Sequence, residues 1–556
     1  MLDAAAIETS LSQLHPDQLR AALQRFLPQN SSAAQRVSTT EALLQSPAGK
    51  SLREAMAKWV VDEVVPVDAL VPESYIKWRS PVRDCMVFVI SRISPARLAP
   101  KLVEQLDLPP RTTPETRLLR LIAEVPGLQK LGQVIARNQH LRPALRNALA
   151  RLENGIRDVK PEEIRAIIEK DVGSRLQRYS VKISRGILSE ASVSAVVRFT
   201  WKNPDTGARE RGVFKVLKPH IPQFFAEDMD YLQGLAHYFG DRHHTYGFPA
   251  DLIPDTFKKV RRLLQHEVNF KREQKTLVEA WDLYRRIPNV RVPTLVRPLC
   301  TARITALTEE SGQKVTSAAA RVSASARTGI AEQLVEALVA VPLFSSRESA
   351  IFHGDPHAGN LLYDTHSGEL TIIDWALRER LSRDQRRHLA LLFLMLSLRD
   401  HLGASEEVLA LSQYPIRTKS RRAQKVRELV TSFIADLPSN HTPGGVDAMK
   451  LLERVAVAGV KFPAPLIMLS KVMFTLDGLL ADICGANTGM SFALARQVAR
   501  HWLTNRSAFR SPLQGGDWVT LQCSALLYPS RMWLRWEKAL LNRFLPPRLL
   551  AAATTC

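Results

Sequence analysis

A polar loop near the middle of the chain carries the residues whose types and spacing point most directly to chemistry. The loop reads HGDPHAGN at 353–360, and Asp374 follows fourteen residues after Asn360, at the end of an apolar run. Transfer of a phosphoryl group from a nucleotide needs one carboxylate to orient or deprotonate the acceptor. It also needs oxygen ligands, here an amide and a second carboxylate, that hold magnesium against the phosphates. We therefore predict Asp355 as the catalytic carboxylate and Asn360 and Asp374 as the metal ligands.

The two histidines of this loop, His353 and His357, lie four residues apart. A pair at that spacing could ligate a metal if it lay on a helix. Pro356 and Gly359 oppose a helix at this point. We therefore predict structural hydrogen-bonding roles for both histidines.

A phosphoryl-transfer site also needs a cation on a strand to bind the phosphates and a carboxylate on a helix to position that cation. Lys215 lies in the apolar strand pattern GVFKVL at 212–217 and fits the first role. Lys218 is a competitor, but three residues along a strand place it on the opposite face. Glu267 and Glu273 share one helical stretch, and a separation of six residues turns their side chains about 120° apart. We expect these two glutamates to have different partners.

The pattern around these residues predicts an α+β fold. Apolar residues at helical spacing dominate the chain as far as Val172, with Pro and Ser clusters between the helices. Short β-like runs then predict a small antiparallel sheet. Its strands are expected at 179–187, 193–201 and 212–217. Further along we predict helices from 223 to about 286, a strand-like run at 290–305, helices to 341, a loop with a β-hairpin at 351–376, and helices at 380–500.

Four parts of the chain together resemble the UbiB-like atypical kinases, a branch of the protein-kinase-like superfamily connected with ubiquinone biosynthesis and isoprenoid-lipid handling. They are KLGQ at 130–133, the strand residue Lys215, the Glu267-x-Asn269 segment and HGDPHAGN. The resemblance extends from about residue 117 to 490, and is strongest at the HGDPHAGN loop and at KLGQ with the downstream LENGIRDVKPEEIRAIIEKDVG. It implies a protein-kinase-like two-lobed fold, with a small antiparallel-sheet lobe, a helical lobe and a helical N-terminal extension.

The resemblance also implies roles for particular residues. Lys130, Gly132 and Gln133 match the family's KxGQ signature, which lies on a helical extension over the active site and is associated with restricted access by protein substrates. Glu267 matches the first position of the ExD signature and would pair with Lys130. By the same resemblance, Glu273 would be the partner of the strand lysine.

The family has an Ala-rich phosphate loop in place of a Gly-rich one, and the corresponding stretch here is SEAS at 189–192. Backbone N–H groups of such a loop can approach phosphate. Ser189, Ala191 and Ser192 are therefore predicted nucleotide contacts. The predicted catalytic and metal-binding residues match the family's catalytic-loop aspartate and metal ligands, and ATP and Mg2+ are the implied cofactors.

The chain departs from the family pattern at three places. The ExD aspartate is Asn269, and the residues after Asp374 are Trp375 and Ala376 instead of Phe-Gly. Ala376 lacks the easy access of glycine to positive φ, so we expect a less mobile metal-binding turn. Glu190 in the Ala-rich loop would place a negative charge beside a triphosphate. None of these changes removes a group needed for magnesium, and we expect a competent ATP site.

Composition and charge restrict the class of protein and its partners. The 556 residues are 45% apolar and 24% charged, which is ordinary for a folded globular chain. Lys plus Arg (76) exceed Asp plus Glu (55) by 21, which favours anionic partners such as a membrane surface or phosphorylated ligands. The basic clusters have no nucleic-acid motif or interleaved aromatic residues, so nucleic acid is not an expected partner.

Several absences bear on the location of the protein. The N-terminus, MLDAAAIETSLSQLHPDQ, has no positive n-region and no apolar h-region, so we predict no signal peptide. No window reaches about 18 uncharged apolar residues, so we predict no transmembrane span. Five scattered cysteines without a CxxC pair indicate a reducing compartment and argue against a zinc site. We expect a cytoplasmic protein that can lie peripherally on the inner face of the membrane.

The C-terminal stretch SRMWLRWEKALLNRF predicts an amphipathic helix. One stripe carries Trp533, Trp536, Leu540, Leu541 and Phe544, and another carries Arg535, Lys538 and Asn542. Such a helix can lie in an anionic membrane surface with its aromatic side chains at headgroup depth. Alternatively it packs on the kinase-like core, and the sequence leaves both interpretations open.

The sequence therefore predicts five regions. They are a helical N-terminal region at 1–110, the helical KxGQ extension at 111–175, a kinase-like N-lobe at 176–310, a kinase-like helical C-lobe at 311–505, and a basic amphipathic tail at 506–556.

The leading functional hypothesis is an ATP- and Mg2+-dependent atypical kinase or ATPase. Its sphere, isoprenoid lipid or quinone intermediates, rests on the resemblance alone. One alternative is a small-molecule phosphotransferase of the aminoglycoside- or choline-kinase type, because HGDPHAGN followed by IIDW also resembles that catalytic loop, although those enzymes lack KLGQ. A catalytically weak nucleotide-binding scaffold is the other.

Overall fold

The chain divides into two compact units. Unit 1 comprises Met1–Arg272 and Leu295–Glu309, and unit 2 comprises Glu273–Thr294 and Glu310–Cys556. The computed structural model describes residues 31–47, 49–71, 73–136, 159–438, 441–485 and 512–544. The stretch LENGIRD at 152–158, which carries part of the family resemblance, lies outside the described residues.

The first part of unit 1 is a group of helices around one apolar core. They are α3 (Ala33–Gln45), α4 (Gly49–Trp59), η1 (Val60–Val64), α5 (Val67–Leu70), η2 (Glu73–Trp78), α6 (Arg79–Ile90), α7 (Pro95–Asp107), α8 (Pro114–Ile122), α9 (Pro126–Ala136), α12 (His220–Asp241), α13 (His243–Tyr246) and α14 (Leu252–Glu267). Buried side chains of the early helices, such as Leu52 and Phe88, belong to the same cluster as Leu235 of α12 and Leu264 of α14. The region before residue 110 thus packs with helices that follow the sheet in sequence.

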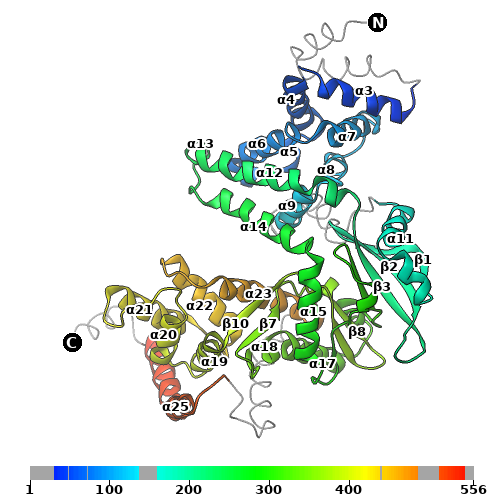
Figure 1. Ribbon diagram of the computed structural model, residues 1–556. Coiled ribbons are helices and arrows are strands. Elements are labelled where there is room, and N and C mark those ends of the chain that lie inside the picture. Colours follow the sequence, from blue (N-terminus) through cyan, green and yellow to red (C-terminus); the bar gives the residue numbers. More distant parts are fainter. Residues whose placement is uncertain are drawn as a thin grey trace. The chain divides into compact units, whose positions relative to one another are not determined.

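A four-stranded antiparallel sheet forms the second part of unit 1 (Figure 1). Its spatial order is β1 (Lys182–Glu190), β2 (Ser194–Lys202), β3 (Arg209–Leu217) and β5 (Ile304–Thr308). The predicted small antiparallel sheet is confirmed, with strand starts within three residues of the expected ones. Buried residues of β2 and β3 alternate with partly or fully exposed ones, and the rings of Phe199 and Phe214 stack with centroids 4.0 Å apart.

Helix α11 (Pro161–Arg178) covers one face of this sheet (Figure 1). Pro161 opens the helix, where its missing N–H costs nothing, and acidic side chains in the first turn and basic ones in the last suit the helix dipole. Ile164, Ile168 and Val172 point into the sheet's apolar core. Their spacing of four residues is what places them on one face of the helix.

Unit 2 is mostly helical. Its helices are most of α15 (Phe270–Tyr284), α16 (Val315–Ala319), α17 (Ala324–Val335), η4 (Glu336–Ala340), α18 (Val341–Leu343), α19 (Arg383–Ser397), α20 (His401–Ala410), α21 (Arg421–Asp436), α22 (Gly445–Val457), α23 (Ala464–Cys484) and α25 (Gly515–Phe544). Within the described ranges, no helix is both long and apolar enough to cross a membrane.

Two small sheets in unit 2 carry the polar loop. One pairs β7 (Ser349–His353) with β10 (Arg378–Ser382), and the other has the order β4 (Val290–Arg291), β9 (Glu369–Ile372), β8 (Leu361–Asp364) and β6 (Gln313–Lys314). The short helix η5 (Ala358–Asn360) lies between β7 and β8. The predicted loop and β-hairpin at 351–376 are therefore confirmed.

Two predictions of secondary structure were wrong in part. The run at 290–305 is not one strand, because β4 and β5 belong to different sheets and η3 (Arg297–Leu299) lies between them. Residues at the start of the predicted helical region 380–500 form the end of β10. Pairing of β10 with β7, which is distant in sequence, decides the conformation of that segment.

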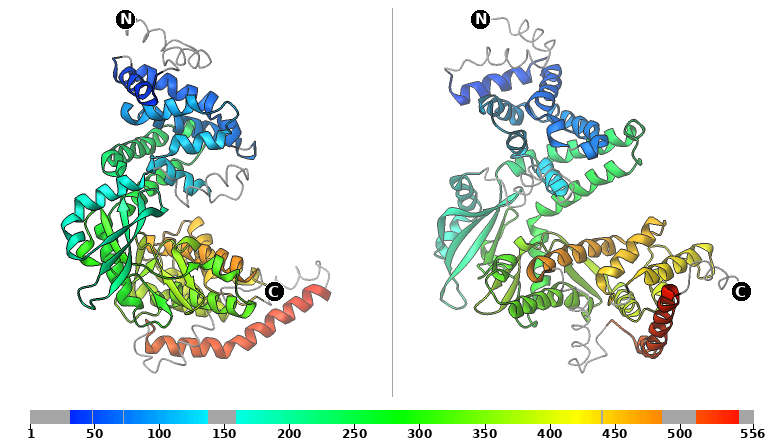
Figure 2. Two further views of the ribbon diagram at one scale, coloured as in Figure 1. Left: turned by 90° about the vertical axis from the view of Figure 1, so that its right-hand side faces the viewer. Right: turned by 180° about the vertical axis from the view of Figure 1, so that it is seen from behind.

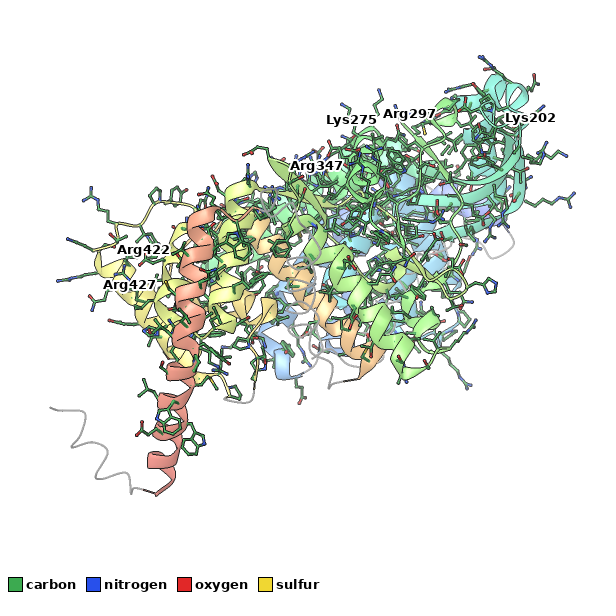
Figure 3. All side chains as sticks on the ribbon, turned by 90° about the horizontal axis from the view of Figure 1, so that it is seen from below. Lys202, Lys275, Arg297, Arg347, Arg422 and Arg427 are labelled. Atoms are coloured by element: carbon green, nitrogen blue, oxygen red, sulfur yellow. The ribbon has the colours of Figure 1, made fainter. Side chains whose placement is uncertain are left out.

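The predicted C-terminal amphipathic segment belongs to helix α25, which packs on the rest of unit 2 along only part of its length. Its first half packs on other helices of unit 2, because Arg387 makes a bidentate ion pair with Asp517 at 2.6 and 2.7 Å. Its later part extends away from those helices (Figures 2 and 3). Trp533 and Trp536 are 63% and 59% exposed there. The side chains of the other predicted stripe residues, Leu540, Leu541 and Phe544, and of Arg535, Lys538 and Asn542, lie outside the described residues.

Candidate active site

The loop that follows β7 holds the predicted catalytic residue in a fixed conformation. The side-chain amide of Asn360 donates to the backbone oxygen of Asp355 at 3.0 Å, and the Asn360 N–H donates to the oxygen of His357 at 2.9 Å. Glycine at 359 suits this turn, because a Cβ atom there would lie 2.7 Å from the His357 ring and would have to displace it. The Asp355 side chain is only 18% exposed.

His353 joins this loop to the turn that carries Asp374. Its Nδ1 accepts a hydrogen bond from the Asp355 N–H at 3.2 Å, and its Nε2 lies 3.1 Å and 2.9 Å from the backbone oxygens of Ile373 and Asp374. Carbonyl oxygens only accept, so Nε2 carries the proton and Nδ1 does not. Burial lowers the pKa of His353 below its usual value, although the charges of Asp355 and Asp374 oppose this. The ring is therefore neutral, and both predicted histidine roles are structural, since His357 accepts from the Gly359 N–H.

The turn after β9 presents Asp374 with a left-handed backbone. Its φ is +57°, a conformation that Asp tolerates better than most residues, and its Oδ1 accepts from the Ala376 N–H at 3.3 Å. Ala376 does not have a positive φ, as expected for alanine, and the lower mobility of this turn stays a prediction. The next residue, Trp375, is fully buried and donates to the oxygen of Ile372.

Asn360 and Asp374 offer oxygen atoms that suit magnesium. The Asn360 Nδ2 is directed to a carbonyl, which leaves Oδ1 as the atom that can face a cation. Magnesium takes only one or two protein carboxylates and completes its shell with water and phosphate oxygens. Among the described residues, no group of three or more His, Cys, Asp and Glu is placed to bind a metal by itself. The Asn360 amide oxygen and the Asp374 carboxylate are thus ligands of the kind that magnesium accepts beside water and phosphate oxygens.

Sequence reasoning missed a fourth polar residue at this site. Lys471 of α23 places its Nζ 3.2 Å from Oδ1 of Asp355, across 116 positions of sequence. The signal available in the sequence was faint: Lys471 is the one basic residue in the 21-residue segment of α23. Nothing in its spacing connects it to the HGDPHAGN loop.

The predicted nucleotide-binding lysine lies in unit 1. Lys215 is on the central part of β3, opposite Val196 of β2 and Thr305 of β5, and its Nζ lies 5.7 Å from the centroid of the Phe270 ring. Glu273 belongs to unit 2, where it is a buried residue of α15. The pairing of Lys215 with Glu273 stays a prediction.

Unit 1 brings together the residues that match KxGQ and ExD. Lys130 of α9 forms an ion pair with Oε1 of Glu267 at the end of α14, and the Ser192 hydroxyl lies 3.4 Å from Oε2 of the same carboxylate. Gly132 is buried in α9, and the side chain of Gln133 lies outside the described residues.

Asn269, which replaces the ExD aspartate, has a structural role in the same region. Asn269 directly precedes α15. Its Oδ1 accepts a hydrogen bond at 3.0 Å from the N–H of Arg272, which lies in the first turn of that helix. Asn and Asp are equally good at capping a helix start in this way. The substitution therefore leaves the helix start intact.

The Ala-rich stretch forms the end of β1 and the turn to β2. Ser189 and Glu190 pair with β2, and the Ala191 N–H donates to the Ser194 oxygen at 2.8 Å. That bond is internal to the turn, and it occupies the Ala191 N–H. The negative charge of Glu190, which we expected to lie beside a triphosphate, has a partner within unit 1. Its side chain is 4% exposed and lies 3.2 Å from the ammonium group of buried Lys218, which neutralises it locally.

A cavity of about 380 Å³ lies elsewhere in unit 2. Its walls are the end of α15 with the turn that follows it (residues between Asp282 and Ile287), parts of η4 and α18, and the loop from Phe344 to Arg347. None of the predicted catalytic or metal-binding residues lines it.

Comparisons with known proteins indicate which family this chain resembles. A family model described as the ABC1 atypical kinase-like domain matches residues 151–408. Over these residues the chain is similar to the ABC1 family. The expected resemblance to the UbiB-like family and the α+β protein-kinase-like fold are thereby confirmed.

Relatives of the ABC1 domain occur in bacteria and plants. A probable protein kinase UbiB of Haemophilus ducreyi is 23% identical over 402 residues, which are 69% of this chain and 70% of that protein. The chloroplastic ACTIVITY OF BC1 COMPLEX KINASE 1 of Arabidopsis thaliana is 26% identical over 270 residues, which are 47% of this chain but only 37% of that protein. A solved structure from Mycobacterium tuberculosis, a complex with erythromycin, gives a TM-score of 0.41 at 15% identity, and covers 64% of this chain and 87% of that one.

Proposed function

We propose that this protein is an ATP- and Mg2+-dependent atypical kinase or ATPase. The observation that supports it most is the set of hydrogen bonds made by the His353 ring. These bonds connect the loop of Asp355 and Asn360 to the turn of Asp374. One carboxylate, one amide oxygen and a second carboxylate then stand on two adjoining segments. This is the set of groups that phosphoryl transfer from a nucleotide requires.

In this proposal each residue of unit 2 has a separate task. Asp355 orients the acceptor hydroxyl or water and takes its proton. Asn360, through Oδ1, and Asp374, through its carboxylate, would hold magnesium. Bound magnesium supplies positive charge that stabilises the phosphate oxygens during transfer.

The predicted nucleotide-binding residues would bind ATP. Lys215 would bind the phosphates, with Glu273 as its partner, and the turn at 189–192 would approach the nucleotide. Because Lys218 neutralises Glu190, the Ala-rich turn carries no exposed acid that would repel a triphosphate. The Lys130–Glu267 ion pair favours a UbiB-like protein over a small-molecule phosphotransferase, since the latter group lacks KLGQ.

The proposal extends to a lipid-linked role at a membrane surface. Val519, Leu526 and Trp533 recur every seven residues on α25 and are 60%, 79% and 63% exposed, so they form one solvent-facing stripe. Leu534 and Trp536 are exposed beside it. Exposed tryptophans together with a chain net charge of +21 suit an anionic lipid surface. We propose that the protein acts in the metabolism of isoprenoid lipids or quinone intermediates, as the family resemblance suggests.

The experiment that tests the proposal measures Mg2+-dependent ATP binding and turnover, with and without anionic liposomes. The variant is Asp374→Asn, because asparagine also tolerates positive φ and can keep the bond to the Ala376 N–H. The change removes the charge and little else. We expect turnover to fall at least a hundredfold, with an unchanged unfolding midpoint. Glu453→Gln, at an exposed carboxylate of α22, is the matched control and should retain activity.

Three outcomes are distinguishable. Turnover that needs magnesium and is lost only in Asp374→Asn supports the proposal, and stimulation by liposomes supports the lipid-linked part. ATP binding without turnover under either condition favours the nucleotide-binding scaffold. If neither binding nor turnover occurs, the proposal is wrong.

A further inference from the structure

An ion pair between α23 and the HGDPHAGN loop defines the surroundings of the catalytic carboxylate. The Lys471 ammonium lies 3.2 Å from Oδ1 of Asp355, and the His357 Nε2 lies 4.0 Å from Oδ2. The Asp355 side chain is 18% exposed and that of Lys471 is 37% exposed. One oxygen of the carboxylate is thus held by a cation at hydrogen-bond distance, and the His357 ring lies on the side of the other oxygen.

The position of Lys471 is set by a packed helix. Val472 and Met473 beside it are fully buried, and the Thr475 hydroxyl donates to the Lys471 oxygen at 2.9 Å. The hydroxyl of buried Ser470 donates one turn back to the Leu466 oxygen. The helix backbone therefore fixes where the lysine side chain begins, while Asp355 lies on a loop. A site built partly on a helix is positioned more precisely than one built on loops alone.

We propose that Lys471 is a positioning residue for Asp355, an inference that rests on the proposed function. By holding Oδ1, the ammonium group fixes the rotamer of the Asp355 carboxylate, which receives the acceptor proton. In the reaction, the acceptor oxygen forms a bond to the γ-phosphorus, the bond from that phosphorus to the ADP oxygen breaks, and the acceptor proton passes to the Asp355 carboxylate. A misplacement of about 1 Å at such a group can cost roughly a hundredfold in rate.

This role is kinetic, and its removal should leave the fold intact. An ion pair between partly exposed side chains contributes little to stability, because solvent screens it. It can still decide the orientation of the carboxylate in the transition state. The expected consequence of losing Lys471 is therefore a lower kcat, with ATP binding and the unfolding midpoint nearly unchanged.

The test compares kcat and KM for ATP in the full chain. We expect Lys471→Met to lower kcat about ten- to a hundredfold and to change KM less than about twofold. Lys471→Arg, which keeps the charge, should recover most of the loss. Lys461→Met removes an exposed lysine just before α23 and should match the wild type. Unfolding midpoints are measured for all variants, and Lys471→Gln replaces Lys471→Met if the methionine variant does not fold.

A double-mutant cycle with Asp355→Asn separates positioning from independent action. If Lys471 acts through Asp355, then Lys471→Met causes no further loss in the Asp355→Asn background. Additive losses, or a raised KM with unchanged kcat, overturn the inference, because they show that Lys471 acts on the nucleotide directly.

The same data separate this inference from the proposed function. Wild-type turnover that is abolished by Asp374→Asn but unaffected by Lys471→Met overturns the inference alone. Absence of any wild-type turnover refutes the proposed function and this inference with it.

Discussion

At the scale of single residues, His353 has the most consequential contacts in unit 2. One ring connects the Asp355 N–H to the backbone oxygens of Ile373 and Asp374. Both ring nitrogens are used only in the neutral form, because a second proton on Nδ1 would face the Asp355 N–H. Protonation of His353 must therefore disrupt the hydrogen bonds that connect the two segments of the candidate site.

The protonation of His353 predicts a pH dependence of stability. Burial lowers the pKa of His353 in the folded state below its usual value of 6.5. Above pH 6.5 the ring is neutral in both states. Between pH 6.5 and the lowered pKa, the unfolded chain binds a proton that the folded chain does not, so the free energy of unfolding falls as pH falls. Below the lowered pKa this contribution is fully lost.

We expect His353→Gln to be less stable than the wild type by about 1–3 kcal/mol at pH 7.5, since buried hydrogen bonds are broken. The difference in the free energy of unfolding between the two proteins should be smaller at pH 5, because only the wild type loses the contribution of the neutral histidine. Urea denaturation followed by tryptophan fluorescence measures both values. His401→Gln, at an exposed histidine, is the control. A difference that stays constant or widens at pH 5 would contradict the assignment of a neutral His353.

At the scale of secondary-structure elements, α25 is held by charge pairs along one side. Asp400 accepts from the Ser524 hydroxyl at 2.7 Å and pairs with Arg531 at 3.0 Å, and Arg531 also contacts the Ser524 hydroxyl. Burial tends to raise the pKa of Asp400, but these hydrogen bonds and charges outweigh it and hold the pKa below its usual value. The side of α25 that carries Asp517 and Ser524 is thus the packed side, opposite the exposed apolar stripe.

Removal of Arg531 should loosen this packing. We expect Arg531→Ala to increase amide hydrogen exchange along α25 about tenfold or more, because the Asp400 carboxylate loses its cation and the helix loses one of its anchors. The exchange of α22 and α23 should not change. Gln522→Ala, at an exposed position of the same helix, is the matched control. Equal exchange in the two variants would show that Arg531 does not hold the helix.

At the scale of the whole molecule, the excess of 21 positive charges and the exposed stripe of α25 act together. Long-range attraction brings a basic protein to an anionic surface, and apolar side chains then insert. Other basic side chains, such as Arg422 and Arg427 of α21, lie in the same unit (Figure 3). The attraction should weaken with salt, since the screening length falls from about 10 Å at 0.1 M to about 3 Å at 1 M.

We expect cosedimentation with vesicles of anionic phospholipid to fall severalfold between 0.1 M and 1 M salt, the range over which surface charges become screened. The double variant Trp533→Ala with Trp536→Ala should bind weakly even at low salt. Its control is Leu402→Ala with Ile467→Ala, which removes two similarly exposed side chains elsewhere in unit 2. If both double variants bind like the wild type, α25 does not contact the lipid, and charge alone explains any binding.

Local sequence determined much of the fold. Alternation in Val193–Trp201 and helical spacing in α11 are local signals, so the small sheet and its covering helix were predictable. The β8–β9 hairpin was predictable because its turn residues lie between two apolar runs. Asp355, Asn360 and Asp374 could be named because they stand in one short stretch with a recognisable spacing.

Tertiary structure decided what depends on distant pairing. Strand β10 exists because β7 pairs with it, and β5 joins β3 from almost ninety positions away. Lys471 reaches Asp355, and Lys218 neutralises Glu190, through side-chain contacts that no local pattern encodes. Residue types and spacing specify which groups the chain offers, whereas burial and long-range packing determine which of those groups meet and which charges are neutralised.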